Sequence, residues 1–122
     1  MNILAGSIII LSVVLDQVSK LWAADVLKDG GSIKILGNFL RLTYAENKGA
    51  AFSILQDQRI FFLITTILML MFLGYIYFKT KNISNLSKIS IAMISGGAIG
   101  NFIDRLRLGY VVDFIDVRFG NL

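Results

Sequence analysis

The sequence predicts a small α-helical polytopic membrane protein with three spanning helices and a short β-element at the membrane surface. Hydrophobic residues make up 56% of the 122 residues and charged residues only 16%, whereas soluble domains average about 45–50% and about 25%. Three long segments are almost free of charge, and the stretch between the first two alternates as a strand does. This length predicts a single domain over residues 1–122.

The first apolar segment predicts a helix over about residues 3–24. Residues 1–15 carry no charged side chain, and the apolar pattern continues past Asp16 and Lys20. These two residues are four apart, so they share one helix face and can form an ion pair. A cleaved signal peptide is the alternative interpretation. It is disfavoured because no Lys or Arg precedes the apolar run and because charges interrupt its later part.

The other two apolar segments predict helices over about residues 59–78 and 88–106. Residues 60–78 are 19 residues without a charge, and a spanning helix requires about 20. The third segment is short and rich in glycine, so we expect it to pack against neighbouring helices rather than face lipid all round. The linker 79–88 has three lysines and no acid, which is typical of a cytoplasmic loop, although charge alone leaves the orientation open.

The β-element is predicted over about residues 33–55 and 109–119. Apolar and polar residues alternate on both sides of Gly37-Asn38, and this turn dipeptide predicts a short hairpin. The tail alternates weakly, through Tyr110, Val112 and Phe114, and we expect it to add a strand or two.

The composition excludes several classes of function. The chain contains no His and no Cys, so a Ser-His-Asp triad, a Cys nucleophile and a Cys/His zinc site are all excluded. We expect neither a metal nor a cofactor, and acid–base groups must come from Asp, Glu, Lys or Tyr. A Ser19–Lys20 dyad is disfavoured because adjacent helical residues point about 100° apart. The net charge of +4 is scattered, which favours anionic lipid headgroups over nucleic acid as a partner.

Polar residues inside the third apolar segment indicate a functional site. A charge at membrane depth costs about 2.5–3.5 kcal/mol on insertion scales. Asn101 and Arg105 are four apart and share a face with Gly97, and Asp104 adjoins Arg105. Helix packing with an interfacial charge pair would explain the glycines but not Asn101, because a buried amide is costly unless it is hydrogen-bonded.

Asp113 is the candidate acid or base of the tail. It is flanked by the bulky apolar residues Val112 and Phe114, and a partly desolvated carboxylate has the profile of a general acid or base. The alternative is an ordinary solvated residue on a surface strand.

Four short blocks together resemble the ordered signature blocks of the lipoprotein signal peptidases (signal peptidase II). They are Asp16-Gln17-Val18-Ser19-Lys20, Asn47-Lys48-Gly49-Ala50-Ala51-Phe52, Gly97-Ala98-Ile99-Gly100-Asn101-Phe102-Ile103-Asp104-Arg105 and Val111-Val112-Asp113-Phe114. One block alone is weakly specific, but the set in this order is highly specific. The resemblance extends from the first helix to about residue 116.

The resemblance implies a bacterial inner-membrane aspartic endopeptidase that cleaves prolipoproteins before a diacylglyceryl-modified cysteine. It also implies four spanning helices, cytoplasmic termini and a β-cradle with the active site on the extracytoplasmic side. The implied partners are prolipoproteins and membrane lipid, and we expect a monomer. By motif, Asp113 matches a catalytic aspartate. Asn47, Gly49, Asn101 and Arg105 match substrate-binding positions, and Asp16, Lys20 and Asp104 match supporting positions.

The chain departs from the family pattern near its end. The family block Phe-Asn-x-Ala-Asp carries the second catalytic aspartate and opens the fourth helix, and it does not occur in these 122 residues. Asp116 is the alternative candidate for the second aspartate, but it is disfavoured because it is only three residues from Asp113, so we expect it on the opposite side of the strand. We therefore expect a C-terminally truncated member that does not itself cleave prolipoprotein.

Two other functions are alternatives. One is a non-catalytic membrane module that binds lipidated peptides or a partner protein. The other is a small transporter or channel subunit with Asp16, Lys20 and Asp104 on an ion path, but a transporter would not require the outer β-element.

Overall fold

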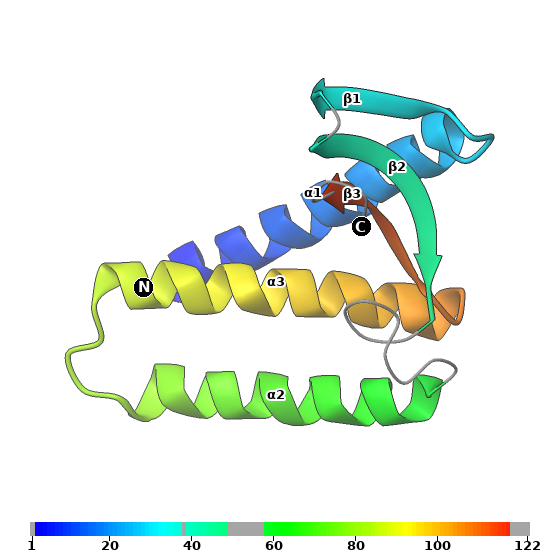
Figure 1. Ribbon diagram of the computed structural model, residues 1–122. Coiled ribbons are helices and arrows are strands. Elements are labelled where there is room, and N and C mark those ends of the chain that lie inside the picture. The colour runs from blue at the N-terminus through cyan, green and yellow to red at the C-terminus, as the bar shows by residue number, and fades with distance from the viewer. Residues whose placement is uncertain (1, 38, 49–57, 118–122) are drawn as a thin grey trace.

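A computed structural model describes residues 2–37, 39–48 and 58–117 of the chain (Figure 1). Its helices are α1 (Asn2–Leu27), α2 (Arg59–Lys79) and α3 (Asn85–Arg107). Its strands are β1 (Ser32–Leu36), β2 (Leu40–Asn47) and β3 (Val111–Val117). The predicted fold class of three apolar helices plus a small β-element is therefore confirmed. The parts of the predicted β-element at 49–55 and 118–119 lie outside the described residues.

All three helices are long and apolar enough to cross a membrane. Only 6% of the residues in the spanning windows of α1 and α2 are buried inside the protein, against 22% in α3. An apolar helix that is exposed over most of its surface requires an apolar environment. Lipid is therefore the natural surrounding of α1 and α2, and α3 is the central helix of the bundle.

Helix α3 packs against both α1 and α2 (Figure 1). Two glycines allow α3 to approach α1 closely. A Cβ atom at Gly96 would collide with the side chain of Ser12, and one at Gly100 would collide with the carboxylate of Asp16. Small residues spaced by four bring membrane helices into close contact, so this pair sets the distance between α1 and α3.

The three strands form an antiparallel sheet in the order β1-β2-β3, at the end of the bundle where α1 and α3 end (Figure 1). The predicted hairpin joins β1 to β2, and Gly37 adopts a positive φ of 54° in its turn, a conformation that favours glycine. Strand β3 follows α3 after only Leu108, Gly109 and Tyr110. The end of α3 and the start of β3 are thus close together in space as well as in sequence.

Candidate active site

A buried ionic cluster joins α1 to α3 directly beneath the sheet. The Nζ atom of Lys20 lies 2.9 Å from Oδ2 of Asp16 and 2.9 Å from Oδ2 of Asp104. Lys20 is only 7% exposed and Asp104 only 1%. Buried charges are tolerated only when they are paired and hydrogen-bonded. The ion pair expected from the four-residue spacing of Asp16 and Lys20 is present, and Asp104 joins it from the other helix.

Two amide side chains complete the hydrogen bonding of this cluster. Lys20 Nζ donates to Oδ1 of Asn101 over 2.9 Å, which accounts for an amide inside an apolar helix. Gln17 Nε2 lies 3.0 Å from Oδ2 of Asp16, 3.2 Å from Oδ1 of Asp104 and 3.2 Å from the carbonyl oxygen of Gly100. Gln17 is not among the residues selected from the sequence. Its signal was present, because Gln17 precedes Lys20 by three residues and so shares its helix face.

The cluster also holds the start of β3. The backbone N–H of Val112 donates to Oδ2 of Asp104 over 3.1 Å, and Val112 is only 5% exposed. Asp113 is the next residue, so its backbone position is fixed by a charge-assisted hydrogen bond, which is stronger than a neutral one. Asp104 therefore anchors the start of the strand that carries Asp113.

Asp113 lines a cavity of about 340 Å³ on the sheet. In the strand register it lies opposite Ala45 of β2, and Asn47 lies opposite Val111. Asn47 lines the same cavity. The predicted catalytic aspartate and one predicted substrate-binding amide are thus brought together from two strands that are far apart in sequence.

Asp116 also lines this cavity, which differs from the expectation that it lies away from Asp113. The pairing of β2 with β3 is irregular between Leu42 and Ala45, and Thr43, within that stretch, donates from Oγ1 to Oδ2 of Asp116 over 3.3 Å. The alternation of side chains along β3 alone does not predict this irregularity, because the irregularity depends on the pairing with β2. The cavity is therefore acidic, with Glu46 as a further lining carboxylate.

Arg105 interacts with one carboxylate of the ionic cluster and with one carboxylate of the cavity. The carboxylates of Asp113 and Asp104 both attract it electrostatically, and its guanidinium carbon is 4.6 Å from the centre of the Phe62 ring of α2. A cation over an aromatic face within about 6 Å is held by the ring. Arg105 thereby links α3 to α2 and to Asp113, which lines the sheet-side cavity.

Of the eight residues selected from the sequence, the described part of the structure places all but Gly49, which lies outside it. Four meet directly in the ionic cluster, namely Asp16, Lys20, Asn101 and Asp104. Asn47 and Asp113 line the adjoining cavity, and Arg105 interacts with both groups.

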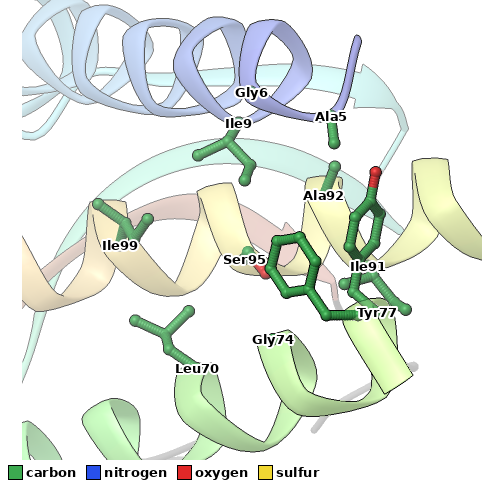
Figure 2. A pocket seen from close by; sticks show the side chains of 11 residues that line it. Ala5, Gly6, Ile9, Leu70, Gly74, Tyr77, Ile91, Ala92, Ser95 and Ile99 are labelled. Carbon is green, nitrogen blue, oxygen red and sulfur yellow. The ribbon is translucent and has the colours of Figure 1, made fainter. Parts of the chain in front are cut away.

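A second cavity, of about 380 Å³, lies among the helices (Figure 2). It is lined almost entirely by small and apolar side chains of α1, α2 and α3, including Ala5, Ile9, Leu70, Gly74 and Ala92. No residue lines both this cavity and the one that contains Asp113. Its lining includes no Asp, Glu, Lys or Arg, and Tyr77 is its one titratable side chain, so it lacks a pair of groups for acid–base catalysis.

Comparisons with known proteins agree with this fold. A family model described as signal peptidase (SPase) II matches residues 8–122. The lipoprotein signal peptidase of Caldicellulosiruptor bescii is 49% identical over 111 residues, which cover 91% of this chain and 72% of the relative. That of Clostridioides difficile is 45% identical over 111 residues, which cover 91% of this chain and 74% of the relative.

Two solved structures have the same fold. One is a bacterial membrane enzyme determined by the in meso method at 2.3 Å resolution. It is 38% identical, with a TM-score of 0.85 over 94% of this chain and 70% of that one. A second bacterial membrane enzyme, at 1.9 Å resolution, is 39% identical, with a TM-score of 0.80 over 93% of this chain and 73% of that one.

Proposed function

The chain belongs to the signal peptidase II family, and on this premise we propose that it is an aspartic endopeptidase that removes signal peptides from lipoprotein precursors. Its relatives are named lipoprotein signal peptidases, so the alternative of a non-catalytic binding module is not favoured. Cleavage before a diacylglyceryl-modified cysteine is the finer expectation for the substrate.

Asp113 is the residue we assign to the chemistry. In a two-carboxylate mechanism, the ionised group takes a proton from water, and the water attacks the scissile carbonyl. The protonated group donates to the carbonyl oxygen and later to the leaving amine, because two nearby carboxylates share one proton. We propose Asp113 as one member of that pair. The supporting observation is that its backbone is anchored to a buried ionic cluster while it lines an open cavity.

Asn47, Asn101 and Arg105 are proposed to hold the substrate. Asn47 lines the cavity beside Asp113, and Arg105 is attracted to Asp113. The Oδ1 atom of Asn101 accepts from Lys20, so the orientation of this amide is fixed and its nitrogen is directed away from that ammonium. Amide and guanidinium N–H groups are the donors that the carbonyl oxygens of an extended peptide require. Gly49 belongs to the same proposal by motif alone.

We place the sheet on the extracytoplasmic side of a bacterial inner membrane. The opposite end of the bundle carries Lys79, Lys81 and Lys88 around the short α2–α3 connection, and cytoplasmic loops carry an excess of Lys and Arg. We further propose that the protein acts as a monomer, because one chain supplies every residue assigned above.

A cleavage assay tests this function. The extended chain consists of these 122 residues followed by the C-terminal residues of the Caldicellulosiruptor bescii relative that lie beyond the matched region. It and the 122-residue chain are reconstituted in vesicles with a diacylglyceryl-modified lipoprotein precursor, and products are identified by mass spectrometry. We expect cleavage before the modified cysteine by the extended chain. That the 122 residues alone do not cleave stays a prediction, and the same assay tests it. Binding of precursor by the extended chain without cleavage would support the non-catalytic alternative.

A further inference from the structure

A third cavity lies on the other face of the sheet from Asp113. It has a volume of about 160 Å³ and is bounded by the ends of α1 and α3 and by strands β2 and β3. Neighbouring residues of a strand point to opposite faces, and accordingly Val112 lines this cavity whereas Asp113 lines the acidic one. We call it the interfacial pocket and define it by Leu21, Lys28, Tyr44, Arg107 and Tyr110.

The interfacial pocket has an excess of positive charge. Its lining contains Lys20, Lys28 and Arg107 but only one carboxylate, that of Asp104. Asp104 and Asp16 already pair with Lys20 at the base of the pocket. Neither Lys28 nor Arg107 forms an ion pair with any described residue. Two cations therefore converge on one small cavity without an acidic partner from the described part of the chain.

The aromatic ring of Tyr44 interacts with one of these cations, Lys28. The Nζ atom of Lys28 is 5.8 Å from the centre of the Tyr44 ring, within range of a cation–π interaction. The Tyr44 hydroxyl donates to Oε2 of Glu46 over 2.9 Å. Burial, followed by this hydrogen bond, raises the pKa of Tyr44 above its ordinary value. Tyr44 therefore contributes its ring to the pocket, because its hydroxyl is engaged by Glu46.

We propose that the interfacial pocket binds the headgroup phosphate of an anionic phospholipid, with Lys28 and Arg107 as its cationic ligands. Lys28 directly follows α1, and Arg107 is the last residue of α3, so both stand where a spanning helix meets the headgroup region. Lys, Arg and Tyr are the residues that anchor proteins at that level. Leu21 of the same pocket is 61% exposed and gives an acyl chain an apolar surface toward the membrane. The inference rests on the membrane placement proposed above.

The competing explanation is that both cations only stabilise helix ends. Cations near a helix C-terminus interact favourably with its dipole. This accounts for a Lys after α1 and an Arg at the end of α3. It does not account for their convergence on one cavity with two tyrosines, and it predicts no preference among lipids.

The test measures lipid binding by the 122-residue chain in detergent. Native mass spectrometry gives the affinities for phosphatidylglycerol and phosphatidylethanolamine, and thermal unfolding gives the stabilisation by each. The variant is Lys28→Gln/Arg107→Gln. The control is Lys34→Gln/Lys81→Gln, which removes the same charge from exposed residues of β1 and of the α2–α3 connection. Inorganic phosphate is a separate arm.

We expect the unmodified chain and the control to prefer phosphatidylglycerol. The affinity of the pocket variant for this lipid should fall by about tenfold or more, because two cations that attract the anionic headgroup are lost. Inorganic phosphate should give no comparable stabilisation. Equal preference in the pocket variant and the control would overturn the site, as would a uniform loss of stability in both lipids. An equal response to free phosphate would overturn the assignment to lipid. This test does not measure cleavage, so its result can be interpreted even if the peptidase assay fails.

Discussion

The Oδ2 atom of Asp104 lies 2.9 Å from Nζ of Lys20, and the same oxygen accepts the backbone N–H of Val112 over 3.1 Å. One buried carboxylate thus connects α1, α3 and β3. Its ion pair with Lys20 fixes the position of the carboxylate, and the carboxylate fixes the start of the strand that carries Asp113. The stability of the fold and the geometry of the proposed active site therefore depend on the same group.

Replacing Lys20 by Met should destabilise the protein by about 3–5 kcal/mol, because the buried Asp104 carboxylate and the partly exposed Asp16 carboxylate are then left without their cation. The double change Lys20→Met/Asp104→Asn should recover more than about 1 kcal/mol of that loss, because it removes one of the two uncompensated charges. Thermal or denaturant unfolding in detergent measures both. A double variant that is less stable than the single one would show that the Asp104 charge is not opposed by Lys20.

Gly100→Ala and Gly97→Ala form a matched pair on one helix. Both gain helix propensity by about 1 kcal/mol. A Cβ at Gly100 meets the Asp16 carboxylate, whereas one at Gly97 meets nothing within 4 Å. We expect Gly97→Ala to leave the free energy of unfolding unchanged or to raise it. Gly100→Ala should lower it by about 1–3 kcal/mol, because the added methyl group overpacks the α1–α3 contact. Unfolding midpoints of the two variants check this, and equal midpoints would contradict the close approach of α1 to α3.

Phe62→Leu should weaken substrate binding through Arg105. It removes the ring that lies 4.6 Å from the guanidinium but keeps an apolar side chain, so we expect KM of the extended chain to rise about three- to tenfold with little change in kcat. In an Arg105→Met background the same change should add almost nothing. Phe72, which is 61% exposed, offers the control Phe72→Leu. A fall in kcat alone would contradict a positioning role for Phe62.

The spanning helices and the hairpin could be predicted because their signals are local. Apolar length defines α2, and alternation around Gly37 defines the β1–β2 turn. The Asp16–Lys20 pair was predictable for the same reason, since residues four apart meet on any helix.

The resemblance assigned Asp104 a supporting position, but its hydrogen bond with Val112 could not be predicted, because that contact depends on the turn that follows α3. The position of Gln17 on the helix face of Lys20 was predictable, but its hydrogen bonds to Gly100 and Asp104 were not, because those acceptors lie on α3. The shared cavity of Asp113 and Asp116 depends on an irregular strand register that neither strand encodes alone.

The central claim is that Asp113 takes part in peptide cleavage. The most direct measurement compares Asp113→Asn with Asp116→Asn in the extended chain, since both carboxylates line the same cavity. Cleavage of the diacylglyceryl-modified precursor is measured together with the unfolding midpoint. We expect Asp113→Asn to lower the rate at least about a hundredfold, as loss of a general acid or base does. Asp116→Asn should stay within about threefold, with both midpoints unchanged. An Asp113→Asn variant that cleaves as fast as the unmodified extended chain would contradict the claim.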